Sequence, residues 1–292
     1  MSVVVTLDGA LHDPSAPLLF ADDLAAVRGD GIFETLLVRE GGPCLLEAHL
    51  QRLAQSAELM DLPAPDGEAW RRAAALAASR WIDEHGSDDG VMRLVYSRGR
   101  ERGGPPTAYL TVAALPDRVA AVRENGLAAL TLARGLPTTA APAPWLLAGA
   151  KTLSYAVNMA ALRYAAERGA GDVIFVSSDG YVLEGPRSTV VIATGEGLLT
   201  PPPSLPILHG TTQQALFDVA SEKGYGCQYA PLRPADLLDA QGVWLVSSIT
   251  LAARVHTLDG RPLRQAPAAA TAGYPAAVEF AELVDRAILT DR

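Results

Sequence analysis

Residues 149–192 read GAKTLSYAVNMAALRYAAERGAGDVIFVSSDGYVLEGPRSTVVI, a run that predicts a helix followed by strands and places Lys151 among small and apolar residues. Most lysines are solvated surface residues. Burial among apolar groups would destabilise the ammonium and lower the pKa of this lysine, leaving an amine able to form a Schiff base. Glu184, before Gly185 and Pro186, is either a turn carboxylate or the acidic partner that keeps a pyridine nitrogen protonated.

The composition limits the classes of protein that fit. The chain has 292 residues, 49% of them hydrophobic, which is enough for a large core or two modest domains. Its net charge of -9 argues against a nucleic-acid binder, which would carry a basic face. Cys44 and Cys227 lack metal-binding spacing, as do the five histidines, so no metal is expected. We see no signal peptide and no apolar run long enough to cross a membrane, and expect a cytoplasmic protein.

The first part of the chain predicts an α+β unit. SVVVTLDGAL indicates two strands around an Asp-Gly turn, and GIFETLLVREGGPCLL indicates a further pair. A helix is expected over Glu47–Met60, ended by Pro63, and a second helix in DGEAWRRAAALAASRWIDEHG. The strands GVMRLVYSRG and AYLTVAALP follow, and their short connection favours antiparallel pairing.

The second part predicts a larger domain. After LPTTAAPAPWLLAGA, which has the composition of a linker, we expect a helix from Leu153 to about Arg168 and the strands DVIFVSS, YVLEG and STVVIAT. A helix over Thr212–Lys223 and the strand GVWLVSS complete this part. The expected organisation is a small N-terminal domain over 1–115, an interdomain linker region over 116–148 and a C-terminal cofactor-binding domain over 149–292.

Two further features concern phosphate. HGTTQQALFDVA places Thr211 and Thr212 at a helix start, where free N–H groups and the helix dipole favour an anion, although a plain threonine cap is the alternative. HLQRLAQSAEL places Arg52 on a mostly apolar helix, as a phosphate-gripping fork or as a surface arginine. Together with the lysine and the glutamate above, they predict a site for pyridoxal 5'-phosphate (PLP).

These motifs resemble the fold-type IV PLP enzymes, which include branched-chain aminotransferases, D-amino-acid aminotransferases and aminodeoxychorismate lyases. The motifs that match are GDGIFE, HLQRL, KTLSY, EGPRSTVVI, LLTPPPSLPILHGTT and WLVSSITLAARVHTLDG, spread over nearly the whole chain. The resemblance implies a two-domain α+β / α/β fold with mixed, largely antiparallel sheets and flanking helices, and a homodimer.

The resemblance also implies roles for single residues. Lys151 would be the Schiff-base lysine and the general base, Tyr155 would lie near the 3-oxygen of PLP, and Glu184 would face its pyridine nitrogen. Thr189 stands where the family usually has asparagine, and Gln213 where arginine often follows the phosphate-binding threonine. The full set of implied cofactor contacts is Arg52, Lys151, Tyr155, Glu184, Ser188, Thr189, Thr211, Thr212 and Ser248.

The choice of reaction depends on substrate contacts. In YSRGRERGGPP, Arg102 is followed by glycines and not by the Arg-x-His pair with which D-amino-acid aminotransferases bind a carboxylate. Phe33 stands where those enzymes usually have tyrosine, and Arg28 and Arg100 are further candidates for binding a carboxylate. The resemblance therefore ranks 4-amino-4-deoxychorismate lyase first, with release of pyruvate and formation of 4-aminobenzoate for folate synthesis. D-amino-acid aminotransferase comes second and branched-chain aminotransferase third, and a PLP carrier without catalysis is the alternative from another class.

Overall fold

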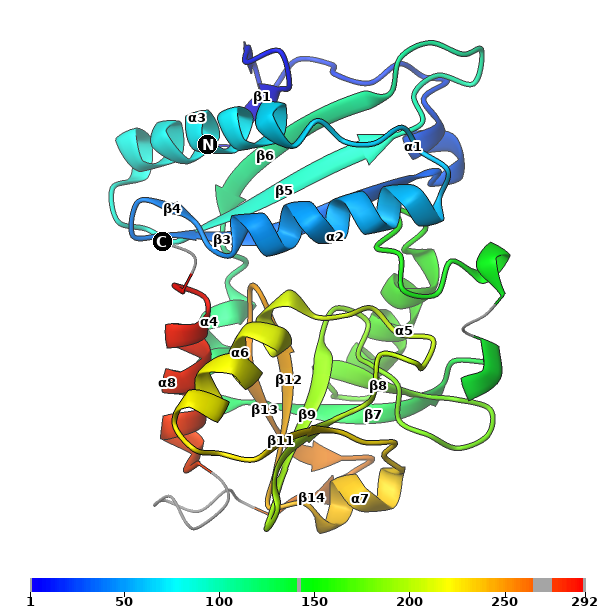
Figure 1. Ribbon diagram of the computed structural model, residues 1–292, viewed down its shortest axis with the longest axis vertical. Coiled ribbons are helices and arrows are strands. Elements are labelled where there is room, and N and C mark those ends of the chain that lie inside the picture. Colours follow the sequence, from blue (N-terminus) through cyan, green and yellow to red (C-terminus); the bar gives the residue numbers. More distant parts are fainter. Residues whose placement is uncertain (1, 141–142, 265–274, 291–292) are drawn as a thin grey trace. The chain divides into compact units, whose positions relative to one another are not determined.

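The computed structural model of the protein describes residues 2–140, 143–264 and 275–290 (Figure 1). Its backbone divides into two compact units. The first unit comprises the chain up to Pro116 together with Ala150–Tyr155, and the second comprises Asp117–Gly149 and Ala156–Thr290. The segment that contains Lys151 therefore belongs to the first unit, although its neighbours along the chain belong to the second.

A six-stranded sheet in the order β2-β1-β6-β5-β3-β4 is the centre of the first unit. All of its neighbouring strands pair antiparallel, which confirms the expected α+β architecture and the hairpin of SVVVTLDGAL. The strands are β1 (Val3–Thr6), β2 (Leu11–His12), β3 (Gly31–Arg39), β4 (Gly42–Pro43), β5 (Gly90–Ser97) and β6 (Thr107–Ala114).

Two long helices pack on this sheet, and Figure 1 shows them running across it. Helix α2 (Leu46–Leu59) confirms the helix predicted over Glu47–Met60 to within a residue at each end. Helix α3 (Gly67–His85) begins where the Asp66 carboxylate accepts a hydrogen bond from a backbone N–H of its first turn, and it buries Trp70 and Trp81. The short helix α1 (Leu24–Arg28) precedes β3.

An eight-stranded mixed sheet forms the centre of the second unit, in the order β11-β10-β9-β12-β13-β7-β8 with β14 beside β13. Strands β7 and β8 pair parallel, as do β13 with β7 and β10 with β11, and the remaining pairs are antiparallel. The strands are β7 (Leu127–Ala133), β8 (Asp172–Val176), β9 (Thr189–Thr194), β10 (Gly197–Thr200), β11 (Cys227–Tyr229), β12 (Gly242–Ser247), β13 (Leu251–Leu258) and β14 (Arg261–Pro262).

Helices flank the second sheet. Helix α6 confirms the helix predicted from Thr212 to Lys223, and α8 packs against both α6 and β13. Trp244 of β12 stacks on Phe280 of α8 with ring centroids 4.0 Å apart. The helices are α4 (Arg118–Asn125), α5 (Ala156–Ala166), α6 (Thr211–Glu222), α7 (Pro234–Asp239) and α8 (Ala277–Ala287), with 3-10 turns η1 (Thr138–Ala140) and η2 (Pro144–Leu146).

Three elements differ from the sequence expectation. The helix expected from Leu153 begins only at Ala156, because the preceding residues hydrogen-bond to β3 instead. YVLEG forms only an isolated bridge between Val176 and Val182. The expected linker region 116–148 contains α4 and β7, and β7 is an inner strand of the second sheet. The division into separate domains at 115 and 149 stays a prediction.

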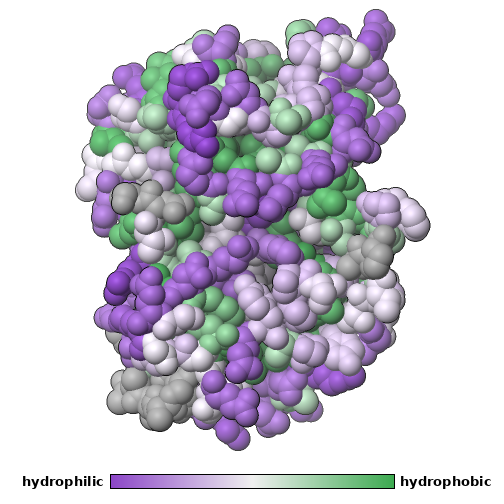
Figure 2. Space-filling view, viewed as in Figure 1, coloured by the Kyte–Doolittle hydropathy of each residue, from purple (hydrophilic) through white to green (hydrophobic). Residues whose placement is uncertain are grey.

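Figure 2 shows hydrophilic side chains over much of the visible surface, with smaller hydrophobic areas among them. Some large apolar side chains are nevertheless exposed on the second unit, including Trp145, Val157 and Tyr164. Among the described helices, none is both long and apolar enough to span a membrane. Neither Cys44 nor Cys227 forms a disulfide bond.

Candidate active site

The lysine segment is fixed by its backbone to the first sheet. Lys151 N donates to Ser56 Oγ (3.1 Å), and Lys151 O accepts from Phe33 N (3.0 Å). Leu153 N donates to Gly31 O (2.8 Å), so this segment pairs with the start of β3. A Cβ atom at Gly31 would lie 2.8 Å from Leu153 Cδ1, so this close approach requires glycine. Both the backbone N–H and the backbone carbonyl of Lys151 therefore hydrogen-bond to residues of the first unit.

Two aromatic rings surround the amine of Lys151. Its Nζ lies 4.5 Å from the ring centroid of Phe33 and 5.9 Å from that of Tyr155. The two rings meet edge to face with centroids 5.4 Å apart. The structure thus brings together three of the residues that the sequence singled out, with two aromatic rings beside the lysine amine. The Schiff-base role of Lys151 stays a prediction.

A buried charge cluster lies beneath the same part of β3. Glu34 is fully buried and accepts from Arg52 Nε (2.8 Å) and Arg52 Nη2 (2.7 Å), and its Oε2 lies 2.7 Å from His49 Nδ1. Burial alone would raise the pKa of Glu34, but the charge and hydrogen bonds of Arg52, with His49, hold it well below its usual value. Glu34 is therefore ionised, and it fixes the guanidinium plane of Arg52.

The state of His49 follows from the same cluster. Burial lowers the pKa of His49, and Arg52 and Lys151 add to this effect against the attraction of Glu34. The ring is therefore neutral at neutral pH, with its proton on Nδ1, from which it donates to Glu34. The negative charge of Glu34 is balanced by one arginine, and the cluster as a whole is electrically neutral.

Sequence reasoning did not assign functions to Glu34, His49 and Ser56. A signal was present, because His49, Arg52 and Ser56 follow one another at helical spacing on α2, and all three are buried. A buried polar stripe on a helix is unusual and requires polar partners. Those partners are the carboxylate of Glu34 and the amide of Lys151.

In the second unit, the segment around Glu184 is held by backbone and side-chain contacts. Leu208 N donates to Glu184 Oε2 (3.1 Å), which orients the carboxylate. Asn158 Nδ2 of α5 donates to Pro186 O (2.8 Å), and Glu184 O accepts from Phe175 N of β8 (2.8 Å). The glutamate that the sequence predicted to face a pyridine nitrogen is therefore fixed from several sides.

Three predicted phosphate-binding segments meet at one end of the second sheet. Thr189, the first residue of β9, lies opposite Val246 near the end of β12, and Ser248 follows in the turn after β12. A Cβ atom at Gly210 would lie 2.3 Å from Thr189 Oγ1, so the start of α6 closely approaches the start of β9. The three segments are distant in sequence, and the fold brings them to the same end of the sheet.

Two buried hydroxyl groups at this end of the sheet have no hydrogen-bond partner among the described residues. Ser188 Oγ and Thr212 Oγ1 are buried and make no hydrogen bond with any described residue. Buried hydroxyls are normally paired, so a ligand with acceptor oxygens fits here. No side-chain hydrogen bond caps the N-terminus of α6 at Gly210, and this helix end, with its positive dipole, lies at the same end of the sheet. The residues present therefore fit a phosphate group such as that of PLP.

The arginines expected to bind substrate lie on α1 and on the loop between β5 and β6, in the first unit. Arg28 ends α1, and its exposed side chain lies 3.6 Å from Glu101. Arg100 pairs with Asp22. Arg102 has no ion-pair partner among the described residues, and it precedes Gly103 and Gly104 at the open tip of the loop.

The described residues hold no group of three or more His, Cys, Asp and Glu side chains that could bind a metal. An aromatic-walled lysine, a fixed glutamate and a cup of hydroxyls and helix N–H groups are the groups that PLP requires of a protein.

Comparisons with known proteins agree with this set of groups. Residues 31–258 match the family described as amino-transferase class IV. The chain is 64% identical to the bifunctional aminodeoxychorismate lyase / D-amino acid transaminase of Mycobacterium tuberculosis, over 99% of this chain and 100% of that protein. It is 25% identical to the D-alanine aminotransferase of Bacillus licheniformis, over 89% of each.

Solved structures show the same fold. The PLP-bound form of a hypothetical aminotransferase from Mycobacterium tuberculosis has a TM-score of 0.95 and 64% identity over 100% of both chains. A fold IV transaminase from Curtobacterium pusillum has a TM-score of 0.89 and 39% identity over 99% of this chain and 98% of that one. The fold and the groups described above define a PLP-dependent enzyme. The chain belongs to the amino-transferase class IV family, the fold-type IV enzymes, which confirms the resemblance, the fold class and the cofactor expected from the sequence.

Proposed function

We propose that this enzyme is a 4-amino-4-deoxychorismate lyase that releases pyruvate and forms 4-aminobenzoate for folate synthesis, with D-amino-acid transamination as its second activity. The observation that carries the proposal is the 64% identity, over essentially the whole chain, to a relative named for both reactions. The loop of Arg102 supports the ranking of the lyase first, because it lacks the Arg-x-His pair.

Lys151, Glu184 and Tyr155 would each have a different role in this reaction. Lys151 would carry the cofactor and, once released, would take the proton from the substrate carbon that bears the amine. Glu184 would hold a proton on the pyridine nitrogen, and Tyr155 would lie near the 3-oxygen. When bound, PLP supplies an electron sink for the charge that forms at the substrate carbon.

Phosphate binding would use groups from several elements. Arg52 would contribute a guanidinium that Glu34 holds in orientation. The hydroxyls and backbone N–H groups at the start of α6 and at the start of β9 would contribute uncharged donors, and the turn after β12 would add another. These residues are Ser188, Thr189, Thr211, Thr212 and Ser248.

Substrate recognition would depend on the arginines of the first unit. Aminodeoxychorismate carries two carboxylates, whereas a simple amino acid carries one. Among the described residues, Arg98, Arg100 and Arg28 lie within 4 Å of carboxylates of their own chain, and Arg102 does not. Arg102 is therefore the arginine that we assign to a substrate carboxylate. Arg28, which lies 3.6 Å from Glu101 of the same loop, is a further candidate, and the Phe33 ring lies next to the Lys151 amine.

A homodimer in the cytoplasm is part of the proposal. The exposed Val157 and Tyr164, seven residues apart on one face of α5, give the second unit an apolar surface that association with a second copy would bury. The acidic net charge of -9 and two cysteines outside any disulfide bond are compatible with a cytoplasmic enzyme.

Product analysis tests the proposed reactions directly. The purified holoenzyme is incubated with aminodeoxychorismate and no keto acid, and separately with D-alanine and 2-oxoglutarate, and products are identified by mass spectrometry. We expect many turnovers to 4-aminobenzoate and pyruvate in the first reaction and slower formation of glutamate in the second. Lys151→Ala is the control and should be inactive in both. A single turnover, or none, with aminodeoxychorismate would refute the lyase.

A further inference from the structure

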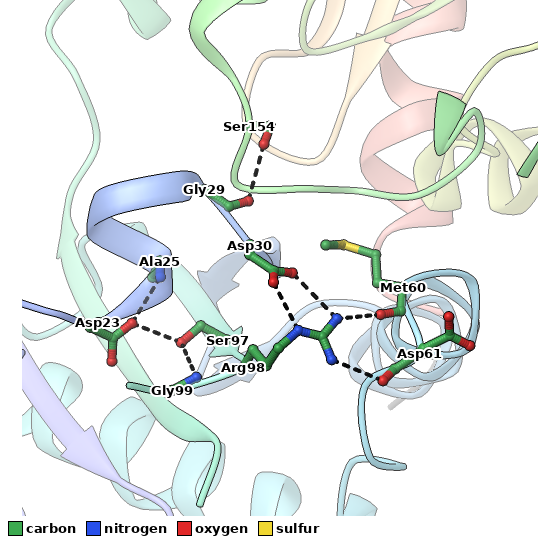
Figure 3. A network of polar contacts seen from close by, with 10 residues as sticks. All are labelled: Asp23, Ala25, Gly29, Asp30, Met60, Asp61, Ser97, Arg98, Gly99 and Ser154. Atoms are coloured by element: carbon green, nitrogen blue, oxygen red, sulfur yellow. Dashed lines mark hydrogen bonds and ion pairs between the residues drawn. The ribbon is translucent and has the colours of Figure 1, made fainter. Parts of the chain in front are cut away.

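One buried carboxylate in the first unit joins three segments. Asp23 has no solvent exposure, and it accepts hydrogen bonds from Ala25 N (2.9 Å), Ser97 Oγ (3.0 Å) and Thr107 Oγ1 (2.5 Å). Figure 3 shows Asp23 with two of these donors, Ala25 and Ser97. A fully buried carboxylate that meets neutral donors only is uncommon, and all three donors converge on this one side chain.

Two of the donors bracket the arginine loop. Ser97 is the last residue of β5 and Thr107 is the first residue of β6, so residues 98–106 form the loop between them. Both stems of the loop are thus tied to one carboxylate. The stems approach each other closely, since a Cβ atom at Gly99 would lie 2.4 Å from Pro105 O. The two ends of the loop, Ser97–Gly99 and Pro105–Thr107, are therefore held together, and we call them the neck of the loop.

The third donor belongs to α1, which carries Arg28. Asp23 caps this helix through Ala25 N, and the residues beside Asp23 pair with the loop: Leu24 N donates to Gly99 O (2.8 Å). Asp23 and Arg100 form an isolated antiparallel bridge. The two elements that carry the proposed substrate arginines therefore share one anchor.

A second set of contacts fixes the loop on its other side. Arg98 Nε donates to Asp30 (2.8 Å), and Arg98 Nη2 donates to Met60 O at the end of α2 (2.6 Å), as Figure 3 shows. By contrast, Gly103 and Gly104 at the tip have positive φ, and a Cβ atom at either would meet nothing within 4 Å. The loop therefore combines a rigid neck with an open tip at Arg102.

We propose that Asp23 is a positioning residue for substrate recognition: it holds the neck of the 98–106 loop and the start of α1 so that Arg102 reaches the substrate carboxylate. This inference rests on the proposed role of Arg102. The hydrogen bonds of Asp23 go to Ala25, Ser97 and Thr107 and not to Lys151 or Arg52 of the same unit, so we expect its loss to change substrate affinity more than PLP affinity.

The test compares Asp23→Ala with a matched control in the holoenzyme. Asp66→Ala removes the other capping aspartate of the first unit, from α3, and leaves the loop untouched. Asp23→Ala should raise the KM for aminodeoxychorismate about tenfold, with kcat less affected and the Kd for PLP within about twofold of wild type. Asp66→Ala should leave KM unchanged. A KM for Asp23→Ala no higher than that of the control overturns the proposal.

Conservative variants show whether Asp23 acts through its hydrogen bonds to the loop or through its negative charge. Asp23→Asn can keep both hydrogen bonds to one oxygen and turn its amide toward Thr107 Oγ1, so its KM should stay near wild type. Thr107→Val removes only the hydrogen bond from Thr107 Oγ1 to Asp23 and should raise KM by a smaller factor. It provides a folded variant if Asp23→Ala does not fold. Wild-type KM in Thr107→Val together with a large increase in Asp23→Asn would refute a positioning role.

A double variant separates this inference from the function on which it rests. If Asp23 acts through Arg102, Asp23→Ala should raise KM in wild type but not further in Arg102→Ala. An equal increase in both backgrounds overturns the positioning role of Asp23. If Arg102→Ala itself leaves KM unchanged, the assignment of Arg102 to the substrate fails instead. Trypsin cleavage at Arg102 reports on the loop without any substrate, and it should be faster in Asp23→Ala than in Asp66→Ala.

Discussion

Single side chains in the first unit depend on one another through charge. Arg52 is nearly buried, and its guanidinium is held by two hydrogen bonds to Glu34. A buried arginine needs a counter-charge whether or not a phosphate is bound, and Glu34 supplies it. The same contact fixes the direction of the guanidinium, which lowers the entropic cost of binding a ligand.

Arg52→Ala tests this dual role. PLP affinity should fall about ten- to a hundredfold, because a charge-assisted hydrogen bond contributes roughly 1.5–3 kcal/mol and a tenfold change is about 1.4 kcal/mol. Unfolding should also become easier by about 3–5 kcal/mol, since Glu34 is left buried without its charge partner. Titration of the apoenzyme with PLP and urea denaturation measure the two effects.

The control for that experiment removes both charges. In Arg52→Ala with Glu34→Ala, no buried charge is left unpaired, so stability should recover in part while PLP affinity stays low. If the single variant binds PLP as wild type does, Arg52 has only a structural role in this enzyme.

His49 predicts a specific dependence of stability on pH. Its pKa is lowered from 6.5 by burial, with Arg52 and Lys151 adding to the effect of burial, so the folded ring is neutral while the unfolded ring gains a proton near pH 6.5. The unfolded state therefore binds more protons as the pH falls below 6.5, and stability should decrease by up to about 1.4 kcal/mol per pH unit. Between pH 6.5 and about 5.5, Glu34 contributes little to this slope, because an unfolded glutamate takes up its proton mainly near pH 4.3.

Urea denaturation at a series of pH values measures this slope. His49→Gln, which cannot titrate, should lose the difference between pH 6.5 and about pH 5.5, although its stability at pH 7 falls as well. Ser56→Ala is the control, because it changes a buried polar residue of the same face of α2 without removing a titratable group, and it should keep the wild-type slope. A wild-type slope in His49→Gln would show that the buried ring is charged when folded.

At the scale of helices and strands, periodicity predicted most elements but not where the chain contacts distant residues. The apolar spacing of Leu50, Leu53 and Ala57 predicts α2 to within a residue, because one face of that helix is buried. The helix expected from Leu153 starts later, because Phe33 and Gly31 bind the backbone of the lysine segment. No local pattern encodes that pairing, and the tertiary contacts override helix propensity there.

The start of α6 offers a test at the same scale. In Gly210→Ala, the added methyl group would lie 2.3 Å from Thr189 Oγ1, so the helix start and β9 must separate. Because Thr212 Oγ1 and Ser188 Oγ lie in these two segments, PLP affinity should fall about tenfold or more. Gly195→Ala is the matched control, since its Cβ atom would meet nothing within 4 Å. Equal PLP affinity in the two variants would argue against phosphate binding at this end of the sheet.

At the scale of the whole molecule, the chain order of the motifs allowed the family to be predicted, whereas the assignment of segments to units was not predictable. The Pro- and Ala-rich stretch over 136–150 is typical of a linker, but the expected linker region 116–148 also includes β7, which precedes that stretch and is an inner strand of the second sheet. Composition reports local flexibility, while membership of a sheet depends on partners such as β8 and β13 that come later in the chain. The residues with chemical roles were predicted best where a motif names them, and Asp23 and Glu34 were missed because their partners are distant in sequence.

The last prediction concerns which reaction the enzyme favours. Aminodeoxychorismate presents a second carboxylate that D-alanine lacks, so loss of Arg102 should reduce kcat/KM for the lyase reaction more than for D-alanine transamination. A reduction of about ten- to a hundredfold for the lyase corresponds to one lost charge-assisted contact of roughly 1.5–3 kcal/mol. Both constants are measured on one preparation of Arg102→Ala with unchanged PLP absorbance, and Arg72→Ala, an exposed arginine of α3, is the control. If D-alanine is the better substrate of wild type, and Arg102→Ala harms its turnover more than the lyase reaction, the enzyme is primarily a D-amino-acid aminotransferase and Arg102 binds the carboxylate next to the amine.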